Sequence, residues 1–333
     1  MDWENLTDEQ LLRLRIKDLK VQIEGCELEQ CVKRLYEELE ARGINFHPPC
    51  YLADEWLCPD RQPIIGIPFF LAHPRLKSIE QQMMLEVEGG TEKSCMKLLR
   101  HEAGHALNYA YEMFRKTRWR QLFGHMSARY SDSYHFLPYS KRFVIHLEHY
   151  YAQSHPDEDF AETFAVWLTP NSDWQKKYRG WPAIKKLQYV DCLTKGIGCR
   201  SPLVESSDHP PPWSASRMTS TLQAYYRRKQ KLLGDEFQAY YDGTLKTLFK
   251  IAQTAPGQQK ASRLLRIHRR QLVDSLAMWT EYRKYDISQL VDKLILRCDA
   301  LGLVAKDDDI ISAATLIATI ASNTLRFTKK EEK

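Results

Sequence analysis

The chain has 333 residues, of which 43% are hydrophobic and 27% charged, and its formal net charge is +5 at pH 7. This composition is that of a soluble globular protein long enough for two domains. No apolar run approaches the roughly 18 residues that a membrane-spanning helix needs, and Met1–Asn5 lacks the basic and apolar regions of a secretory signal. We therefore expect a cytoplasmic protein without a membrane span, whose 8 cysteines are reduced.

Residues 6–42 are expected to be helical. Thr7 is a good helix cap, and Gln10 stands at the position that completes a capping box. Apolar residues then recur at helical spacing, with a bend near Gly25, until a typical helix end at Gly43. We interpret residues 1–43 as N-terminal helices that form part of the scaffold.

Residues 44–75 change to strand-like patterns and predict a small sheet. Ile64–Leu71 is a short apolar strand in which Pro68 favours an edge position. An open edge strand can bind an extended peptide as one more strand. An ordinary hairpin packed on the following helix explains the pattern equally well.

Residues 91–115 predict a long helix that follows the cap Thr91 and contains a His-Glu-x-x-His motif. His101 and His105 are four residues apart, so both imidazoles lie on one helix face and can bind one metal ion. Glu102 is rotated by about 100° from His101, within reach of a water on that metal. Two histidines, one further ligand and a neighbouring carboxylate are what a zinc hydrolase needs. A helix with two surface histidines is the simpler alternative.

A second helix is expected at residues 156–169, where Pro156 suits the first turn and acidic residues cluster near the N-terminus. Glu162 lies 57 positions after His105 and precedes an apolar run, so we expect it to be the third metal ligand.

Three neighbouring residues are rivals for that role. Asp159 and Glu158 lie three and four residues before Glu162 on the same helix face, and His155 is also close. Asp159 ranks next after Glu162. Acids that do not bind the metal are expected to orient a ligand histidine.

These two motifs resemble those of the bacterial zinc-binding metallopeptidases, a gluzincin-like family. The resembling segments are His101-Glu102-x-x-His105, residues 151–165 with Glu158-Asp159-Phe160-Ala161-Glu162-Thr163-Phe164-Ala165, Asp54-Glu55-Trp56-x-Cys58-Pro59, and residues 67–74. The resemblance covers roughly residues 1–200, and the chain is more distantly similar to the titration-factor peptidases.

The resemblance implies a zincin fold in which His101, His105 and Glu162 bind Zn²⁺ and Glu102 is the general base. Thermolysin-type enzymes place an aspartate four residues after the glutamate ligand, whereas this chain has Val166 there. We therefore expect the residues that orient the ligands to differ from those of thermolysin.

The segment between the two ligand helices is rich in aromatic and basic residues. Peptide hydrolysis needs a donor that stabilises the developing oxyanion, and this segment is the expected source. The candidates are Tyr134, His135, Tyr139 and Arg142. The sequence does not choose among them.

Residues 206–212 are rich in serine and proline and predict a linker between a domain at 1–205 and a helical segment at 213–333. The segment holds 21 Lys+Arg and 13 Asp+Glu, a net charge of +8, which leaves −3 for the first 212 residues. A basic helical domain can bind an acidic partner, although a solvated basic face is the simpler interpretation.

The predicted fold is α+β and predominantly helical: a zincin-type catalytic domain with a small sheet, followed by a basic helical domain. The predicted function is that of a zinc metallopeptidase acting on a peptide or protein substrate, with Glu102 moving a proton from activated water to the leaving amine. Two alternatives stay open: a regulatory protein that binds a partner through a zincin scaffold, and a zinc hydrolase of a non-peptide amide.

Overall fold

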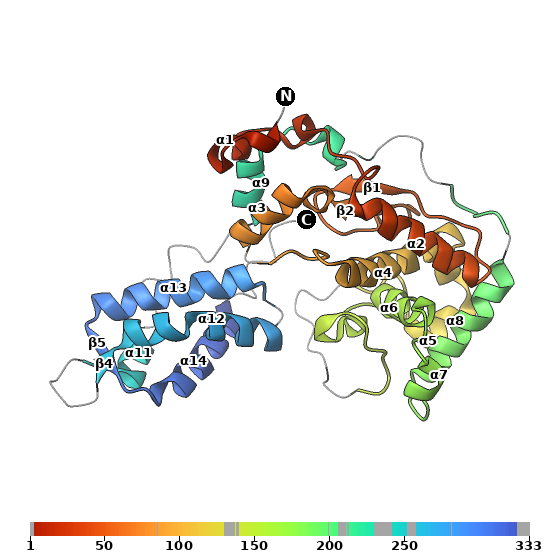
Figure 1. Ribbon diagram of the computed structural model, residues 1–333. Helices are drawn as coiled ribbons and strands as arrows, with labels where there is room; N and C mark the ends of the chain where they lie inside the picture. Colours follow the sequence, from red (N-terminus) through yellow and green to blue (C-terminus); the bar gives the residue numbers. More distant parts are fainter. Residues whose placement is uncertain are drawn as a thin grey trace. The chain divides into compact units, whose positions relative to one another are not determined.

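The computed structural model describes residues 3–84, 86–129, 137, 140–198, 200–205, 211, 213–229, 242–251, 258–280 and 282–324. The molecule is predominantly helical, with two small sheets, which agrees with the predicted α+β class (Figure 1).

The chain divides into two compact units, Met1–Gln81 with Val87–Tyr225, and Gln82–Glu86 with Tyr226–Lys333. The boundary therefore lies after the predicted linker at 206–212, of which only Pro211 is described. Residues 213–225 belong to the first unit because they bond to it. The indole nitrogen of Trp213 donates to the Tyr51 hydroxyl at 2.5 Å, and the Tyr225 hydroxyl donates to the carbonyl of Asp54 at 2.8 Å.

The elements up to Lys229 are the following, in chain order. The α-helices are α1 (Asp8–Leu12), α2 (Glu27–Ala41), α3 (Pro74–Met84), α4 (Glu92–Ala110), α5 (Thr117–Phe123), α6 (Pro156–Leu168), α7 (Trp174–Lys177), α8 (Ile184–Ile197) and α9 (Leu222–Lys229). The strands are β1 (Cys50–Ala53) and β2 (Ile65–Pro68). Short 3-10 helices lie at Trp3–Asn5, Ile16–Leu19, Phe69–Ala72, Met113–Arg115, Glu148–Gln153 and Ala215–Arg217.

The N-terminal segment is less helical than the sequence predicts. The capping box of Thr7 and Gln10 is confirmed, with hydrogen bonds of 3.3 and 3.0 Å. However, α1 ends at Leu12, because the backbone NH groups of Ile16 and Lys17 donate to carbonyls of residues 220 and 218, both at 3.0 Å. This pairing with a distant segment overrides the local helical pattern.

The small sheet of the first unit has two strands, so β2 lies at an edge as expected for Ile64–Leu71, but this edge is already paired at Gly66. β1 and β2 pair in parallel, from Cys50 opposite Ile65 to Ala53 opposite Pro68. On its other side, Gly66 of β2 exchanges two backbone hydrogen bonds with Leu57, of 2.8 and 3.3 Å. Leu57 therefore already occupies the place where an added substrate strand would pair with Gly66.

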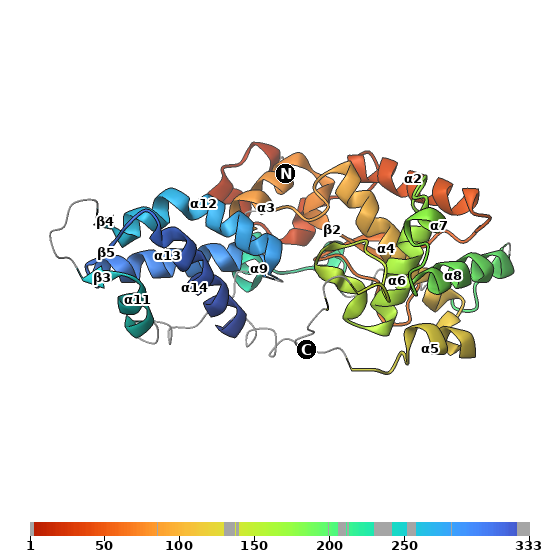
Figure 2. The ribbon, with the colours of Figure 1, turned by 90° about the horizontal axis from the view of Figure 1, so that it is seen from below.

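Helix α4 lies between α2 and α6 (Figures 1 and 2). It begins as predicted, with Thr91 as cap and Ser94 completing a capping box. It ends at Ala110, before the predicted residue 115, because Glu112 adopts a left-handed conformation with φ of 45°. Toward α2, the guanidinium group of Arg100 donates two hydrogen bonds of 2.7 Å to the carboxylate of Glu38. Both side chains are buried, so this bidentate ion pair fixes α4 against α2.

Toward α6, Gly104 permits an unusually close approach of the two helices. A Cβ atom at Gly104 would lie 2.8 Å from the Cα of Ala161, 3.1 Å from its carbonyl oxygen and 3.2 Å from the Cβ of Phe164. Two of these three atoms belong to backbone, which cannot turn aside as a flexible side chain can. The hydrogen side chain of Gly104 therefore sets the separation of α4 and α6.

The second unit has its own core. Its described elements after Tyr226 include α11 (Asp242–Leu248), α12 (Ala261–Trp279), α13 (Lys284–Ala300), α14 (Asp309–Thr324), β3 (Lys250–Ile251), β4 (Gln259–Lys260) and β5 (Leu303–Ala305). β5 pairs antiparallel with β3 and β4 on its two sides. The buried side chains of α12, α13 and α14 pack into a hydrophobic cluster with those of α11 and β5.

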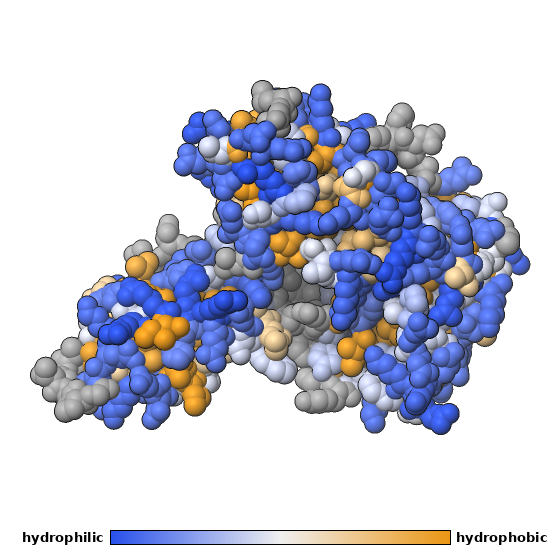
Figure 3. All heavy atoms as spheres, in the orientation of Figure 1, coloured by the Kyte–Doolittle hydropathy of each residue, from blue (hydrophilic) through white to orange (hydrophobic). Residues whose placement is uncertain are grey.

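Hydrophilic residues dominate the face drawn in Figure 3, and hydrophobic residues are exposed on the second unit. The large hydrophobic side chains exposed there are Ile267, Met278, Trp279, Leu296 and Ile311. Within the described ranges, the helices are too short or too polar to cross a membrane.

Replacing Gly104 by alanine is expected to force α4 and α6 apart and to lower the free energy of unfolding by about 1–3 kcal/mol. The matched control is Gly196→Ala in α8, where a Cβ would meet nothing within 4 Å. At that helical position alanine is expected to be neutral or to stabilise by about 0.5–1 kcal/mol. Urea unfolding of both variants measures the difference. Equal stabilities would contradict the close approach at Gly104.

Candidate metal centre

Three ligand atoms from α4 and α6 form a small triangle. Nε2 of His101, Nε2 of His105 and Oε2 of Glu158 each lie 3.1 Å from the other two. All three side chains are buried, and together they are a group that can hold a metal ion. Ligands 2.0–2.1 Å from a tetrahedral zinc ion are about 3.3 Å apart, so the spacing of the triangle fits such an ion.

The carboxylate in the triangle belongs to Glu158, and the expected placement of Glu162 is corrected accordingly. Oε1 of Glu162 lies 2.8 Å from Nδ1 of His101, the ring nitrogen on the side away from the triangle. Oε2 of Glu162 accepts the backbone NH of Leu147 at 2.8 Å. Both oxygens of Glu162 are thus engaged outside the triangle. Glu158 and Glu162 lie one helical turn apart on the same face of α6, and the turn that carries Glu158 places its carboxylate oxygen in the triangle.

Asp157 contacts Nδ1 of His105, as Glu162 contacts Nδ1 of His101. Its Oδ2 lies 2.9 Å from Nδ1 of His105 and accepts the Tyr109 hydroxyl at 2.6 Å. Its Oδ1 accepts the side-chain amide of Asn108 at 2.8 Å. A carboxylate on each Nδ1 favours the tautomer that carries its proton there and presents the Nε2 lone pair to a metal.

Without a metal, the same geometry holds protons on the histidines. Burial would lower the pKa of His101, but hydrogen bonds to Glu158 and Glu162 raise it to about 9. Burial would likewise lower the pKa of His105, but Asp157 and Glu158 raise it well above its ordinary value. Burial would raise the pKa of Glu158, yet the charge of His105 and the hydrogen bonds from both imidazoles hold it well below the usual range. In the metal-free protein, the neighbouring carboxylates therefore favour the protonated form of both imidazoles.

The charge of the side chains around the triangle is compatible with a divalent metal ion. Asp157, Glu158 and Glu162 bring three negative charges into a buried cluster, where unpaired charge is costly. Two imidazolium protons or one divalent cation supply the same compensating charge. A metal ion can therefore replace the two protons without changing the net charge of the cluster.

Glu102 lies beside the triangle but outside it. Burial raises the pKa of its carboxyl group, against the opposing charges of His101 and His105. In the described part of the chain, we find no hydrogen bond to this carboxylate. A buried carboxylate with a raised pKa next to a candidate metal site has the properties of a proton acceptor.

The other residues named from the sequence fall in different places. Asp159 points away from the triangle, where its Oδ2 accepts a hydrogen bond of 2.5 Å from Lys186. His155 caps α6 instead of binding a metal, because its Nδ1 accepts the backbone NH of Asp157 at 3.1 Å. Arg142 is exposed on the surface. Tyr134, His135 and Tyr139 lie outside the described residues.

Sequence reasoning missed several side chains that support the site. Asn108 and Tyr109 follow His105 by one helical turn, and this spacing alone indicated that they share its side of α4. His146 and Tyr151 also approach the cluster. The ring of Tyr151 lies 5.7 Å from that of His101, centroid to centroid, and Nε2 of His146 lies 2.9 Å from the carbonyl of Lys97. Burial lowers the pKa of His146 to about 4, so this imidazole is neutral at neutral pH.

Replacing Glu158 by glutamine is expected to weaken zinc binding more than replacing Glu162 does. Glu162→Gln removes only the carboxylate that orients His101, which typically costs roughly 10- to 100-fold in affinity. Competition with a zinc-binding dye measures both affinities, and circular dichroism checks folding. The reverse order, with Glu162→Gln the more damaging change, would restore the ligand assignment made from the sequence.

Zinc affinity is expected to rise with pH between about 6 and 9, because the raised pKa values of His101 and His105 make protons compete with the metal. The sign follows from the ligand state: protonated imidazole cannot bind zinc, and it persists up to the raised pKa. Each displaced proton contributes about tenfold in affinity per pH unit. Calorimetric titration in buffers of different ionisation enthalpy counts the protons released. An affinity independent of pH over this range would contradict the protonated cluster.

Comparison of the chain with protein-family models, curated proteins and solved structures finds no match. The resemblance to zinc metallopeptidases therefore stays a prediction, and function has to be inferred from the site itself.

Proposed function

We propose that this protein is a zinc-dependent peptidase with His101, His105 and Glu158 as metal ligands and Glu102 as general base. The observation that supports the proposal most directly is the triangle of two Nε2 atoms and one carboxylate oxygen, 3.1 Å apart, with the buried Glu102 beside it. We further propose that the first unit is a zincin-type domain, since a helix carrying His-Glu-x-x-His and a second helix carrying the acid define that site.

A zinc ion bound by these ligands would supply a water molecule activated for attack at neutral pH. The residues of the chain supply the rest. Asp157 and Glu162 hold the two imidazoles in a fixed orientation through their Nδ1 atoms. Glu102 accepts a proton from the attacking water and passes it to the leaving amine, a role that its raised pKa favours.

The presence of Glu102 favours an enzyme over a protein that only binds a partner, because metal binding alone does not require that carboxylate. Peptide bonds are the proposed target because a hydrolase of this ligand type activates water toward a carbonyl. Hydrolysis of a non-peptide amide uses the same residues, so the substrate panel in the experiment should include both kinds of bond.

Glu102→Gln is expected to keep zinc and to lower hydrolysis by about 10²- to 10⁴-fold, because the variant retains the ligands and loses the base. The zinc-loaded wild type and variant are incubated with a mixed peptide library, and mass spectrometry follows the products. Metal content is measured on the same samples. The control is Glu112→Gln, since Glu112 lies beyond the end of α4.

Three outcomes would decide against the proposal. Wild-type cleavage unaffected by Glu102→Gln would exclude the general base. Bound zinc without any cleavage dependent on Glu102 would favour a binding protein. Cleavage of non-peptide amides alone would move the protein to another class of hydrolase.

A further inference from the structure

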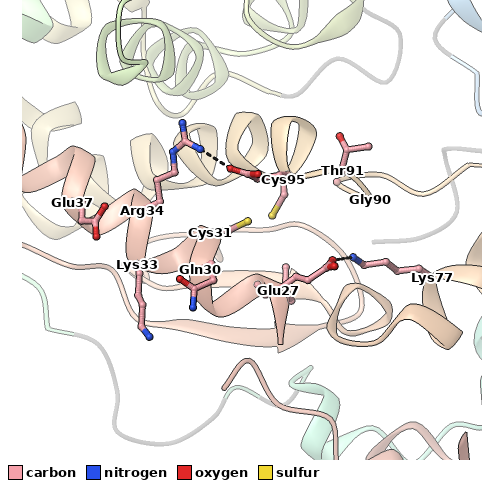
Figure 4. Close-up of a pocket in the computed structure, with 13 residues that line it drawn as sticks. Glu27, Gln30, Cys31, Lys33, Arg34, Glu37, Lys77, Gly90, Thr91 and Cys95 are labelled. Carbon is pink, nitrogen blue, oxygen red and sulfur yellow. Dashed lines mark hydrogen bonds and ion pairs between the residues drawn. The ribbon is translucent and has the colours of Figure 1, made fainter. Parts of the chain in front are cut away.

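Two cysteines face each other across α2 and α4, near the N-terminal ends of these helices. Cys31 is the fifth residue of α2, and Cys95 is the fourth residue of α4. Both line a cavity of about 720 Å³. Figure 4 shows their sulfur atoms pointing toward one another, and the two thiols lie within hydrogen-bonding reach. Neither Cys31 nor Cys95 is in a disulfide in the structure.

The surroundings of the pair shift the pKa values of the two thiols in opposite directions. The hydrogen bond with Cys95 lowers the pKa of Cys31, opposed by burial and by the charge of Glu92 and assisted by the charges of Lys77 and Arg34. The same hydrogen bond, and then burial, raises the pKa of Cys95. Cys31 is also the more exposed of the two residues, at 6% against 2% for Cys95, so Cys31 is assigned as the attacking thiol and Cys95 as the thiol that reacts with it next.

Other described thiols with a raised pKa lack this arrangement. Burial raises the pKa of Cys50 and of Cys298 to about 12. Neither lines the cavity. A thiol with a raised pKa is mostly protonated at neutral pH and reacts slowly with oxidants. Cys31 and Cys95 differ from these thiols in having both a sulfur partner and an opening that a small molecule can enter.

We propose that Cys31 and Cys95 form a redox-active dithiol that reduces low-molecular-weight disulfides, with the cavity receiving the disulfide. The inference does not depend on the proposed peptidase function, because neither cysteine takes part in the metal centre.

The lining of the cavity indicates which disulfides fit. The lining carries two ion pairs of 2.6 Å, one between Arg34 and Glu92 and one between Lys77 and Glu27, of which Figure 4 labels the second. A peptide-like disulfide that itself bears ammonium and carboxylate groups can exchange partners with these ion pairs. A volume of about 720 Å³ is in the range of cavities that bind small molecules.

The reaction balances without a further oxidant. The Cys31 thiolate attacks one sulfur of the small disulfide, forms a mixed disulfide and releases one small thiolate, which takes up a proton. The Cys95 thiolate then attacks the Cys31 sulfur and releases the second small thiolate, which is also protonated. The dithiol loses two electrons and two protons, and the small disulfide gains both. The product is a Cys31–Cys95 disulfide that links α2 to α4.

The test treats the full chain with oxidised glutathione, in the presence of a metal chelator, and identifies each cysteine by alkylation and peptide mass spectrometry. In the wild type, a Cys31–Cys95 disulfide is expected. In Cys95→Ser, glutathione should accumulate on Cys31, because no second thiol can release it. In Cys31→Ser, Cys95 should react at least about tenfold more slowly than Cys31 does in Cys95→Ser.

Cys298→Ser is the matched control, because it removes a buried thiol from the other unit and should leave the reaction unchanged. Circular dichroism checks that each variant folds. If a variant does not fold, the rates at which iodoacetamide alkylates Cys31, Cys50 and Cys298 in the wild type decide the matter, and Cys31 should be fastest. Glutathione attached to the exposed Cys192 with no Cys31–Cys95 disulfide would overturn the proposal, as would alkylation of Cys31 no faster than that of Cys298.

Discussion

The candidate site depends on the close approach of α4 and α6 at Gly104. Gly104 stands between the two histidines of α4, and Ala161, which it contacts, stands between the two glutamates of α6. With so little side-chain volume at the crossing, imidazoles and carboxylates on either side of it come within 3.1 Å of each other. A larger residue at the crossing would hold the polar groups apart and leave them buried without partners, which is costly.

The buried acids of α6 have different roles because each meets a different part of an imidazole. Glu158 meets the Nε2 atoms, whereas Asp157 and Glu162 meet one Nδ1 atom each. The outer pair is itself held by a backbone NH, a hydroxyl and an amide, so neither imidazole can rotate without losing hydrogen bonds. The arrangement fixes the orientation of every ligand atom through neighbours that come mainly from the same two helices.

Local features of the site were predictable from the sequence. The capping box at Thr7, the cap at Thr91, the helix carrying His101 and His105, and the helix opened by Pro156 follow from patterns within a few residues. The choice between Glu158 and Glu162 did not follow, because both lie on one face of α6 and the crossing with α4 decides between them.

Features that depend on distant partners were also missed. α1 ends early because residues 218 and 220 bond to Lys17 and Ile16. Because these residues belong to the first unit, the boundary between the units lies after the proline-rich stretch. The three-stranded sheet of the second unit joins very short strands that have no clear periodicity. The pairing of Cys31 with Cys95 joins two helices that are far apart in the chain, and no spacing rule indicates it.

Helix α4 carries Cys95 near its capped N-terminus and His101 further along. Between them, Arg100 bonds the helix to α2. A disulfide at Cys95 would therefore constrain the same helix that carries the two imidazoles. A helix bends little, so a shift at one end also moves the other end. Oxidation of the thiols would therefore displace the histidines of the cluster, and metal binding at the histidines would displace Cys95. Oxidation of the thiols and binding of a metal would then influence each other through α4.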